Sequence, residues 1–262
     1  MFDSSNRRFS VRVMFSRKSL LDLYWKMHRV LVPELRYCQY IYEEVLNKVV
    51  RDDIKWLDLG CGHQVLPAWR FEQEKRLIEK AGMVVGIDAD LPSVEKHRSV
   101  HVKLVGNISA LPFQDNSFDL ITANMVVEHL DNPMLQFQEV SRVLKPGGVF
   151  VFHTPNASGY STMLARLLPE GLKPALIRML QGRPSEDVFR TFYRANTETD
   201  ICRLTQATGL NSLEIRLVAS SAELAVIPPL AFLELLWIKL SLTKAFRRLR
   251  TNLIVTLAKQ TK

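Results

Sequence analysis

The chain has 262 residues, of which 47% are hydrophobic and 24% charged, a globular composition that excludes disordered and fibrous proteins. Its three cysteines lie far apart without a C-x-x-C pair, so we expect no disulfide framework and no zinc or other metal site. The formal net charge of +8 divides into +5 over residues 1–30, −4 over 31–238 and +7 over 239–262. Basic ends favour contact with nucleic acid or an anionic membrane surface, or simply form a solvated surface.

The first 50 residues are predicted to form two helices. Apolar residues recur at three- and four-residue spacing over 15–50, and Pro33 interrupts the pattern, so the second helix is expected from Pro33 or Glu34 to Val50. We interpret 1–50 as a helical lid. Three tyrosines are candidates for the inner surface of this lid or for ordinary packing: Tyr37, Tyr40 and Tyr42.

Five short apolar runs follow, and helix-like stretches separate them. The runs are 55–60, 83–88, 101–106, 118–123 and 148–154, and the helical stretches include 69–81 and 133–144. Alternation at this spacing predicts right-handed βαβ units and a parallel sheet. The predicted fold class is therefore α/β, a Rossmann-like doubly wound sheet. Residues 145–148 (K-P-G-G) are expected to form the turn that begins the fifth strand.

The alternation lapses after Asn156. Two apolar, basic segments, at about 157–190 and 220–250, are predicted to be helical insertions into one domain that spans 51–262. Both contain leucines interspersed with lysine or arginine, which distinguishes them from the preceding strand and helix pattern.

A helix and two strands are expected to complete the sheet. The helix covers about 197–208, begins at residue 196 or 197 and ends at Gly209. Residues 210–219 and 251–259 are predicted to be two edge strands, and the last strand is expected to run antiparallel to the others.

The first strand ends in a glycine-rich loop, Leu57-Asp58-Leu59-Gly60-Cys61-Gly62-His63. Glycines let a backbone turn sharply and approach a ligand closely, and sheets of this type bind ligands at the carboxyl ends of their strands. A dinucleotide site requires G-x-G-x-x-G, and Val65 stands at the third glycine position, which argues against such a site. The Asp58 carboxylate would repel phosphate and favours a cationic ligand.

Four motifs extend this pattern in order: WLDLGCG (56–62), VVGIDAD (84–90), GNISALPFQDNSFDLITANMVVEHL (106–130) and QEVSRVLKPGGVFVFHTPN (138–156). Their order and spacing are similar to those of the class I S-adenosylmethionine-dependent methyltransferases. The resemblance is strongest to the small-molecule branch that includes the quinone-biosynthesis methyltransferases. It covers 50–156 well and 190–218 loosely, and it implies methyl transfer to a small-molecule acceptor with S-adenosylmethionine as cofactor.

The resemblance also implies a role for the residues at the strand ends. The loop backbone at Gly60, Cys61 and Gly62 would pass the methionine tail, and Asp58 would face its ammonium group. Asp88 would accept both ribose hydroxyls. The other implied cofactor contacts are Ala89 on the adenine, Asn107 and Ile108 at the adenine edge, and Asn124 and Met125 beneath the reactive end. Two positions depart from the family pattern, because Gln64 replaces a common glycine and Asn107 a common aspartate.

Candidates for catalysis follow the fourth and fifth strands. His129 and His153 would suit a general base if the acceptor is a hydroxyl, whereas a carboxylate or an activated ring carbon needs little help from a base. Tyr193 and Arg194 are candidates for closing over the acceptor. Each also has a simpler interpretation, which is capping or packing for the histidines and a surface turn for Tyr193 and Arg194.

The apolar, basic insertions are the main indication of the substrate class. Glu234, Lys239 and two prolines argue against a transmembrane span within 224–250, so an interfacial amphipathic helix is the better interpretation, and 159–183 has the same character. In the predicted helix, which runs from about Leu230 to Arg250, Glu234 lies on one side and most leucines lie opposite. The same segments could instead cover the sheet or form an interface in an oligomer.

Three functions remain open on these observations. The first is a methyltransferase, peripheral to a membrane, that acts on a lipid-like or glycan-linked acceptor. The second is an inactive cofactor-binding partner subunit, which the departures at Gln64 and Asn107 motivate. The third is an RNA methyltransferase, although nucleic acid is the weaker expectation because residues 123–129 lack an N-P-P-Y type signature. The N-terminus lacks an apolar core of signal-peptide length, so we expect a cytoplasmic protein.

Overall fold

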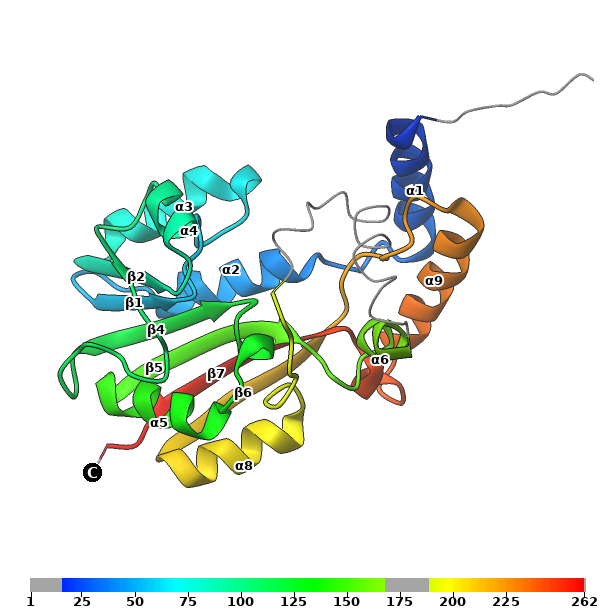
Figure 1. Cartoon of the computed structure of the whole chain (residues 1–262). Coiled ribbons are helices and arrows are strands. Elements are labelled where there is room, and N and C mark those ends of the chain that lie inside the picture. The colour runs from blue at the N-terminus through cyan, green and yellow to red at the C-terminus, as the bar shows by residue number, and fades with distance from the viewer. Residues whose placement is uncertain (1–15, 168–188, 262) are drawn as a thin grey trace, which may run out of the picture.

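A seven-stranded sheet organises the part of the molecule that the structure describes (Figure 1). The computed structural model describes residues 16–167 and 189–261. The strands are β1 Lys55–Leu59, β2 Met83–Asp88, β3 Val102–Val105, β4 Phe118–Asn124, β5 Leu144–Pro155, β6 Leu210–Val218 and β7 Asn252–Lys259. The helices are α1 Arg17–Leu31, α2 Cys38–Val49, α3 Phe71–Lys80, α4 Leu91–Lys96, α5 Pro133–Val143, α6 Tyr160–Leu167, α8 Glu198–Thr208 and α9 Pro228–Ser241. Short 3-10 turns are η1 Ala68–Arg70, η2 Val127–His129 and η5 Arg247–Leu249.

The strand order is β3-β2-β1-β4-β5-β7-β6, and β1 to β5 are parallel. The chain moves outward from β1 to β3 and then returns to place β4 on the other side of β1. This change of direction creates a switch point between β1 and β4, where sheets of this class bind ligands at the carboxyl ends of the strands. The predicted α/β doubly wound fold is confirmed.

Strand β7 runs antiparallel to both β5 and β6, which confirms the expected antiparallel last strand. The prediction that 251–259 is an edge strand is wrong, because β7 lies between β5 and β6 and only β6 is at the edge. Residues 252–257 of β7 are all buried, which is the pattern of an interior strand rather than of one with a solvated face.

The predicted turn at 145–148 lies inside β5. This strand already pairs with β4 at Leu144, and the register then jumps so that Val149 pairs with Leu120. Residues 145–148 therefore form a bulge, with Gly147 at a φ of +74°. The Lys145 ammonium lies 2.8 Å from both carboxylate oxygens of Asp119 on β4, which holds the bulge in the sheet.

Helices cover both faces of the sheet (Figure 1). On one face, α2 and α3 pack on alternate strand residues such as Trp56, Leu120 and Val151. On the other face, α5 and α8 pack on the residues between them, among which Phe150 and Phe152 contact Phe137 of α5. The alternation of strand side chains between two faces thus produces two cores.

The two N-terminal helices lie in different parts of the molecule. The second starts at Cys38 rather than at Pro33 or Glu34, because residues 33–37 form a turn and an extended segment. Helix α2 belongs to the core over the sheet, whereas α1 packs with α9 in a separate cluster around Tyr24 and Leu235. The proposed lid boundary at residue 50 stays a prediction.

The second insertion contains a shorter helix than predicted. Helix α9 ends at Ser241, and residues 242–250 fold back through η5. The Arg250 guanidinium donates to the carbonyl oxygens of Ser241, Leu242 and Leu217, so it satisfies the end of the helix and ties it to β6. Of the first insertion, 168–188 lies outside the described residues, and so do residues 1–15 of the predicted lid.

The core under α5 gives a first test of this packing. Phe137 is fully buried between Phe150 and Phe152, so Phe137→Ala should lower the free energy of unfolding by about 3–5 kcal/mol in urea denaturation. Leu135→Ala on the exposed side of the same helix is the control and should cost less than about 1 kcal/mol. Equal losses in the two variants would contradict the assigned orientation of α5.

Candidate functional site

The loop after β1 has two glycines with positive φ, +59° at Gly60 and +50° at Gly62. A Cβ added at Gly60 would lie 2.4 Å from Cγ2 of Val126, so the loop after β4 approaches too closely for any side chain. A Cβ added at Gly62 would meet no atom within 4 Å. Gly60 therefore allows close packing with the neighbouring loop, whereas Gly62 keeps its backbone open to a ligand.

The Asp88 carboxylate closes β2 beside this loop. It accepts a hydrogen bond from the Gly62 N–H at 2.8 Å and another from the Asp90 N–H at 2.9 Å. The side chain is half-buried, and each of its oxygens keeps a lone pair for a further donor. Two backbone donors thus fix an acidic group at the switch-point edge, and Ala89 beside it is exposed.

The side chain of Cys61 points away from the loop opening. It is buried, and its sulfur lies against Gly86, where an added Cβ would be only 2.8 Å from it. Burial raises the pKa of the thiol, so Cys61 is an inert filler at neutral pH. Only its backbone borders the open side of the loop.

Asp58 lies buried beneath the glycine loop. It accepts a hydrogen bond from the Thr122 hydroxyl, and Thr122 in turn accepts one from the Trp56 indole at 2.6 Å. Burial raises the pKa of Asp58 to about 7, with smaller contributions from Glu74 and Asp88. The carboxylate is therefore poised to ionise when a positive charge approaches.

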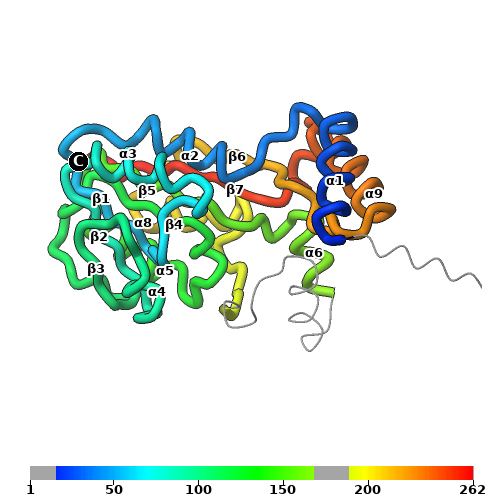
Figure 2. Tube along the Cα trace, turned by 90° about the horizontal axis from the view of Figure 1, so that it is seen from above, coloured from blue at the N-terminus to red at the C-terminus, as the bar shows by residue number. Residues whose placement is uncertain are grey.

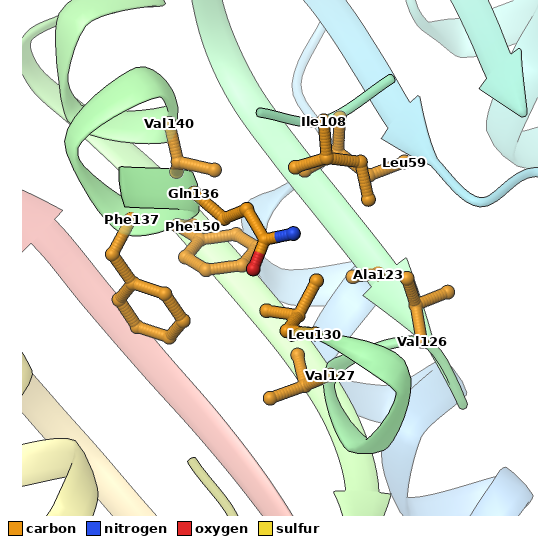
Figure 3. Close-up of a pocket in the computed structure, with 10 residues that line it drawn as sticks. All are labelled: Leu59, Ile108, Ala123, Val126, Val127, Leu130, Gln136, Phe137, Val140 and Phe150. Carbon is orange, nitrogen blue, oxygen red and sulfur yellow. The ribbon is translucent and has the colours of Figure 1, made fainter. Parts of the chain in front are cut away.

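The segment after β3 contributes Asn107 and Ile108. Asn107 is exposed, and its side-chain oxygen accepts from the Ser109 N–H at 2.9 Å. Ile108 points inward and lines a void of about 10 Å³ together with Leu59, Val126 and others (Figure 3). This void is about the size of one water molecule, so it belongs to the wall of the site and does not hold a substrate.

A polar cluster forms where β4 and β5 end. Asn124 donates to the side-chain oxygen of Gln39 at 3.2 Å, and its own oxygen lies 2.9 Å from Nδ1 of His153. The Met125 N–H donates to the His153 carbonyl at 2.8 Å, and Met125 has a φ of +60°. A non-glycine residue in this conformation costs energy, and such residues concentrate at functional sites.

Sequence reasoning missed Gln39. It is one polar residue on an amphipathic helix, and nothing in the local pattern distinguishes it from a solvated side chain. Only the tertiary packing of α2 over the sheet brings it to Asn124 and His153. Of the three tyrosines, Tyr42 is fully buried, whereas Tyr37 and Tyr40 are exposed and contact Trp69.

His153 is almost fully buried, and burial lowers its pKa to about 4. The imidazole is therefore neutral at physiological pH and is shielded from solvent. This environment suits a group that orients Asn124 better than one that exchanges protons with bulk water.

His129 and Glu128 hold the segment that precedes α8. Nδ1 of His129 lies 2.8 Å from the Arg190 carbonyl, and the Glu128 carbonyl accepts from the N–H of Phe192 at 2.8 Å and of Tyr193 at 3.2 Å. The Glu128 carboxyl accepts from the Thr154 hydroxyl at 2.8 Å, and burial raises its pKa. These contacts give His129 and Glu128 a structural role in positioning 189–194.

Tyr193 and Arg194 line an open groove of about 540 Å³ between the start of α5 and α8. The Arg194 guanidinium donates to the Asp131 carbonyl, and the Tyr193 ring lies 5.0 Å from the Arg166 guanidinium. Among the described residues that line this groove, none belongs to the glycine loop. The structure therefore places Tyr193 in a groove that the glycine loop does not line, and its catalytic role stays a prediction.

The central part of the chain is similar in sequence to known methyltransferases. Residues 57–152 match the family described as "Methyltransferase domain". A demethylmenaquinone methyltransferase of Staphylococcus aureus is 36% identical over 108 residues, which are 39% of this chain and 43% of that protein. A malonyl-(acyl-carrier protein) O-methyltransferase of Erwinia billingiae is 32% identical over 133 residues, 50% of each chain.

Solved structures share the fold. An S-adenosylmethionine-dependent methyltransferase from Mesorhizobium loti has a TM-score of 0.52 at 16% identity and covers 82% of this chain and 96% of its own. A second one, from Methanosarcina mazei, has a TM-score of 0.53 at 16% identity and covers 83% of this chain and 98% of its own.

Residues 57–152 form a class I S-adenosylmethionine-dependent methyltransferase domain. The predicted resemblance to this class and to its quinone-biosynthesis members is confirmed, and S-adenosylmethionine is the cofactor of the class. The matching regions span between 30% and 51% of the lengths of the curated relatives, so the similarity concerns the methyltransferase domain and not the whole proteins.

The buried carboxyl of this methyltransferase domain predicts a pH-dependent stability. The folded protein binds the Asp58 proton more tightly than the unfolded chain does, because the pKa of this carboxyl is about 7 when folded and near 4 when unfolded. The stability that comes from this proton is complete below the unfolded pKa and is lost as the pH rises through the folded pKa. Asp58→Asn mimics the neutral acid. The free energy of unfolding of this variant minus that of the wild type should therefore increase by roughly 2–4 kcal/mol when the pH is raised from 5 to 8.5.

Urea denaturation at the two pH values measures this difference. Asp119→Asn is a control for general pH effects. Its carboxylate lies near Lys145 and has a lowered pKa, so it should stay ionised across this range. A stability difference between Asp58→Asn and wild type that does not change with pH would contradict the raised pKa.

Proposed function

We propose that this protein transfers a methyl group from S-adenosylmethionine to a small-molecule acceptor of lipid-like or glycan-linked character. The observation that carries the proposal is the half-buried Asp88 carboxylate, which two backbone N–H groups hold beside an open glycine loop at the switch point. An acidic group in that place can accept both hydroxyls of a ribose.

The described residues fit this cofactor at its polar ends. The open backbone at Gly62 has room for the methionine tail, and Asp58 below it is poised to ionise opposite an ammonium group. Asn107 can accept from the adenine amino group through the second lone pair of its side-chain oxygen. S-adenosylmethionine, when bound, supplies an electrophilic methyl group on a positively charged sulfur.

Beyond the cofactor, we assign the acceptor side to Gln39, Asn124, Met125 and His153. Their mutual hydrogen bonds fix three polar side chains where β4 and β5 end, and alignment of two reactants is the main contribution that an enzyme makes to such a displacement. The neutral, buried His153 is a poor base for exchange with solvent. This environment favours an acceptor that needs little deprotonation, such as a carboxylate or an activated ring carbon.

The names of two relatives agree with this acceptor class. One is named for demethylmenaquinone and the other for the malonyl group of acyl-carrier protein. We extend only the small, apolar or acyl character of these acceptors to this protein.

A second candidate is a cofactor-binding subunit without catalysis. It rests on Asn107, whose side-chain oxygen already accepts from the Ser109 N–H where family members present a carboxylate. Tight binding of S-adenosylmethionine without methyl transfer to any fraction of a cell extract would favour this candidate over the enzyme.

Cofactor binding should depend on Asp88. Asp88→Ala removes two charge-assisted acceptors, each worth about 1.5–3 kcal/mol, so the affinity for S-adenosylmethionine in titration calorimetry should fall by about a hundredfold or more. Asp90→Asn is the matched control, because it retains the acceptor that caps α4 at the Ser93 N–H. The proposal is wrong if Asp88→Ala binds as tightly as the Asp90→Asn control.

Methyl transfer should depend on Gln39 separately from cofactor binding. Gln39→Ala removes one of the hydrogen bonds that hold Asn124 at the acceptor side, so transfer of a labelled methyl group to the responsive fraction of a cell extract should slow by about tenfold. Calorimetric affinity for S-adenosylmethionine should remain within about twofold of wild type. Gln138→Ala, on the exposed side of α5, is the control and should change neither quantity. A loss of cofactor affinity in Gln39→Ala would move this residue from the acceptor side to the cofactor side.

A further inference from the structure

The outward face of α9 carries five large apolar side chains. Among the described residues, no other part of the protein covers most of their surface. Leu233 is 60% exposed, and Leu230, Phe232, Leu236 and Leu240 are each between 41% and 43% exposed. Both views place α9 at one end of the molecule, outside α1 (Figures 1 and 2). We propose that this α9 face docks on the surface of an anionic lipid bilayer.

The contacts of Glu234 fix the orientation of the helix. This buried carboxyl accepts from the N–H groups of Glu223 at 2.9 Å and Leu224 at 2.8 Å, and from the Tyr160 hydroxyl at 2.8 Å. Rotating α9 to bury its leucines would break all three hydrogen bonds and leave unsatisfied polar groups. The side of α9 that carries Glu234 also buries Ala231, Leu235 and Ile238, so it is fixed inward, and the second apolar side of the helix faces outward.

The exposed apolar residues of the α9 face lie together on one helix. Scattered apolar side chains are normal on a protein surface, but a contiguous row on one helix marks an interaction site. Helix α9 has 14 residues, and among the described helices none is long and apolar enough to cross a bilayer. A helix of this kind can instead lie in the interface, with its apolar side among the acyl chains.

The charges around the α9 face indicate that an anionic surface binds there. Lys239, Lys244 and Arg248 are exposed along and just after the helix, and the sequence has no acidic residue from 239 to 262. The neighbouring α1 adds exposed Lys26 and Arg29. Anionic lipid attracts such groups with about 1 kcal/mol each. A second copy would bring two basic surfaces together, which disfavours a dimer through this face.

The position of the α9 face relative to the acceptor side suggests how a lipid-like acceptor reaches the site, and this step rests on the proposed function. Helices α1, α6 and α9 lie beyond the carboxyl ends of β4 and β5, the edge that holds Asn124 and His153 (Figure 1). A protein docked through α9 would thus present its acceptor side toward the bilayer. A lipid-like acceptor could then reach the site without crossing much water.

Co-sedimentation with vesicles tests the docking without cofactor or turnover. Wild-type protein should bind vesicles that contain 30 mol% phosphatidylglycerol in phosphatidylcholine at least about tenfold more tightly than pure phosphatidylcholine. The double variant Leu233→Glu/Leu236→Glu should lose at least about tenfold in partition to the anionic vesicles. The triple variant Lys239→Ala/Lys244→Ala/Arg248→Ala should lose most of the preference for phosphatidylglycerol.

Leu213→Glu on β6 is the matched control, because Leu213 is 62% exposed and lies on the edge strand. It should bind vesicles as tightly as the wild type. Asp88→Ala should also bind vesicles as tightly as the wild type, because vesicle binding does not require the cofactor, and this variant separates a failure of docking from a failure of the methyltransferase assignment. Three results would overturn the proposal. The first is equal vesicle binding by all variants. The second is no vesicle binding by the wild type together with a concentration-dependent dimer in light scattering. The third is no vesicle binding by the wild type together with a lower thermal stability of the double variant, because that result would mean that another part of the chain covers the α9 face.

Discussion

The hydrogen bond from the Gly62 N–H to the Asp88 carboxylate joins the two parts of the candidate site. It fixes the loop after β1 to the end of β2, and neither element alone would hold a nucleoside. The bond forms because β1 and β2 are parallel neighbours, so their carboxyl ends lie at the same edge of the sheet. The positive φ at Gly62 turns its N–H toward the acid while leaving its other side open.

The other features of the site lie around this pair. Asp58 is buried below the loop with a raised pKa, and the polar cluster of Gln39, Asn124 and His153 lies at the ends of the next two strands. Beyond that edge, α9 exposes leucines because the hydrogen bonds of Glu234 fix the opposite side of the helix inward. The arrangement thus runs from a charged cofactor site, through a neutral acceptor side, to an apolar surface. This order suits the transfer of a small group to an apolar acceptor.

Local patterns in the sequence predicted the features that depend on neighbouring residues. The parallel strands were predictable because each contains a short apolar run, and the glycine loop because two glycines follow a buried strand. The leucine side of α9 was also predictable from its spacing opposite Glu234. The early end of this helix was not, because it depends on Arg250 reaching back to the Ser241 and Leu242 carbonyls.

Features that depend on distant packing were not predictable from one sequence. The interior position of β7 is set by its pairing with both β5 and β6, and the role of Gln39 is set by where α2 crosses the sheet. The roles of the two candidate histidines stay predictions, and their surroundings also depend on distant packing. His129 and His153 suit a base by type, but the structure engages one with the Arg190 carbonyl and buries the other.

The central claim is that a nucleoside cofactor lies over the glycine loop and contacts Asp88. Titration of ¹⁵N-labelled protein with S-adenosylhomocysteine tests it directly through the amide resonances of the glycines. Gly60 and Gly62 should shift strongly, while Gly209, which ends α8 in the left-handed conformation at the far edge of the sheet, should not move. Saturating shifts elsewhere, with Gly60 and Gly62 unchanged, would contradict the account.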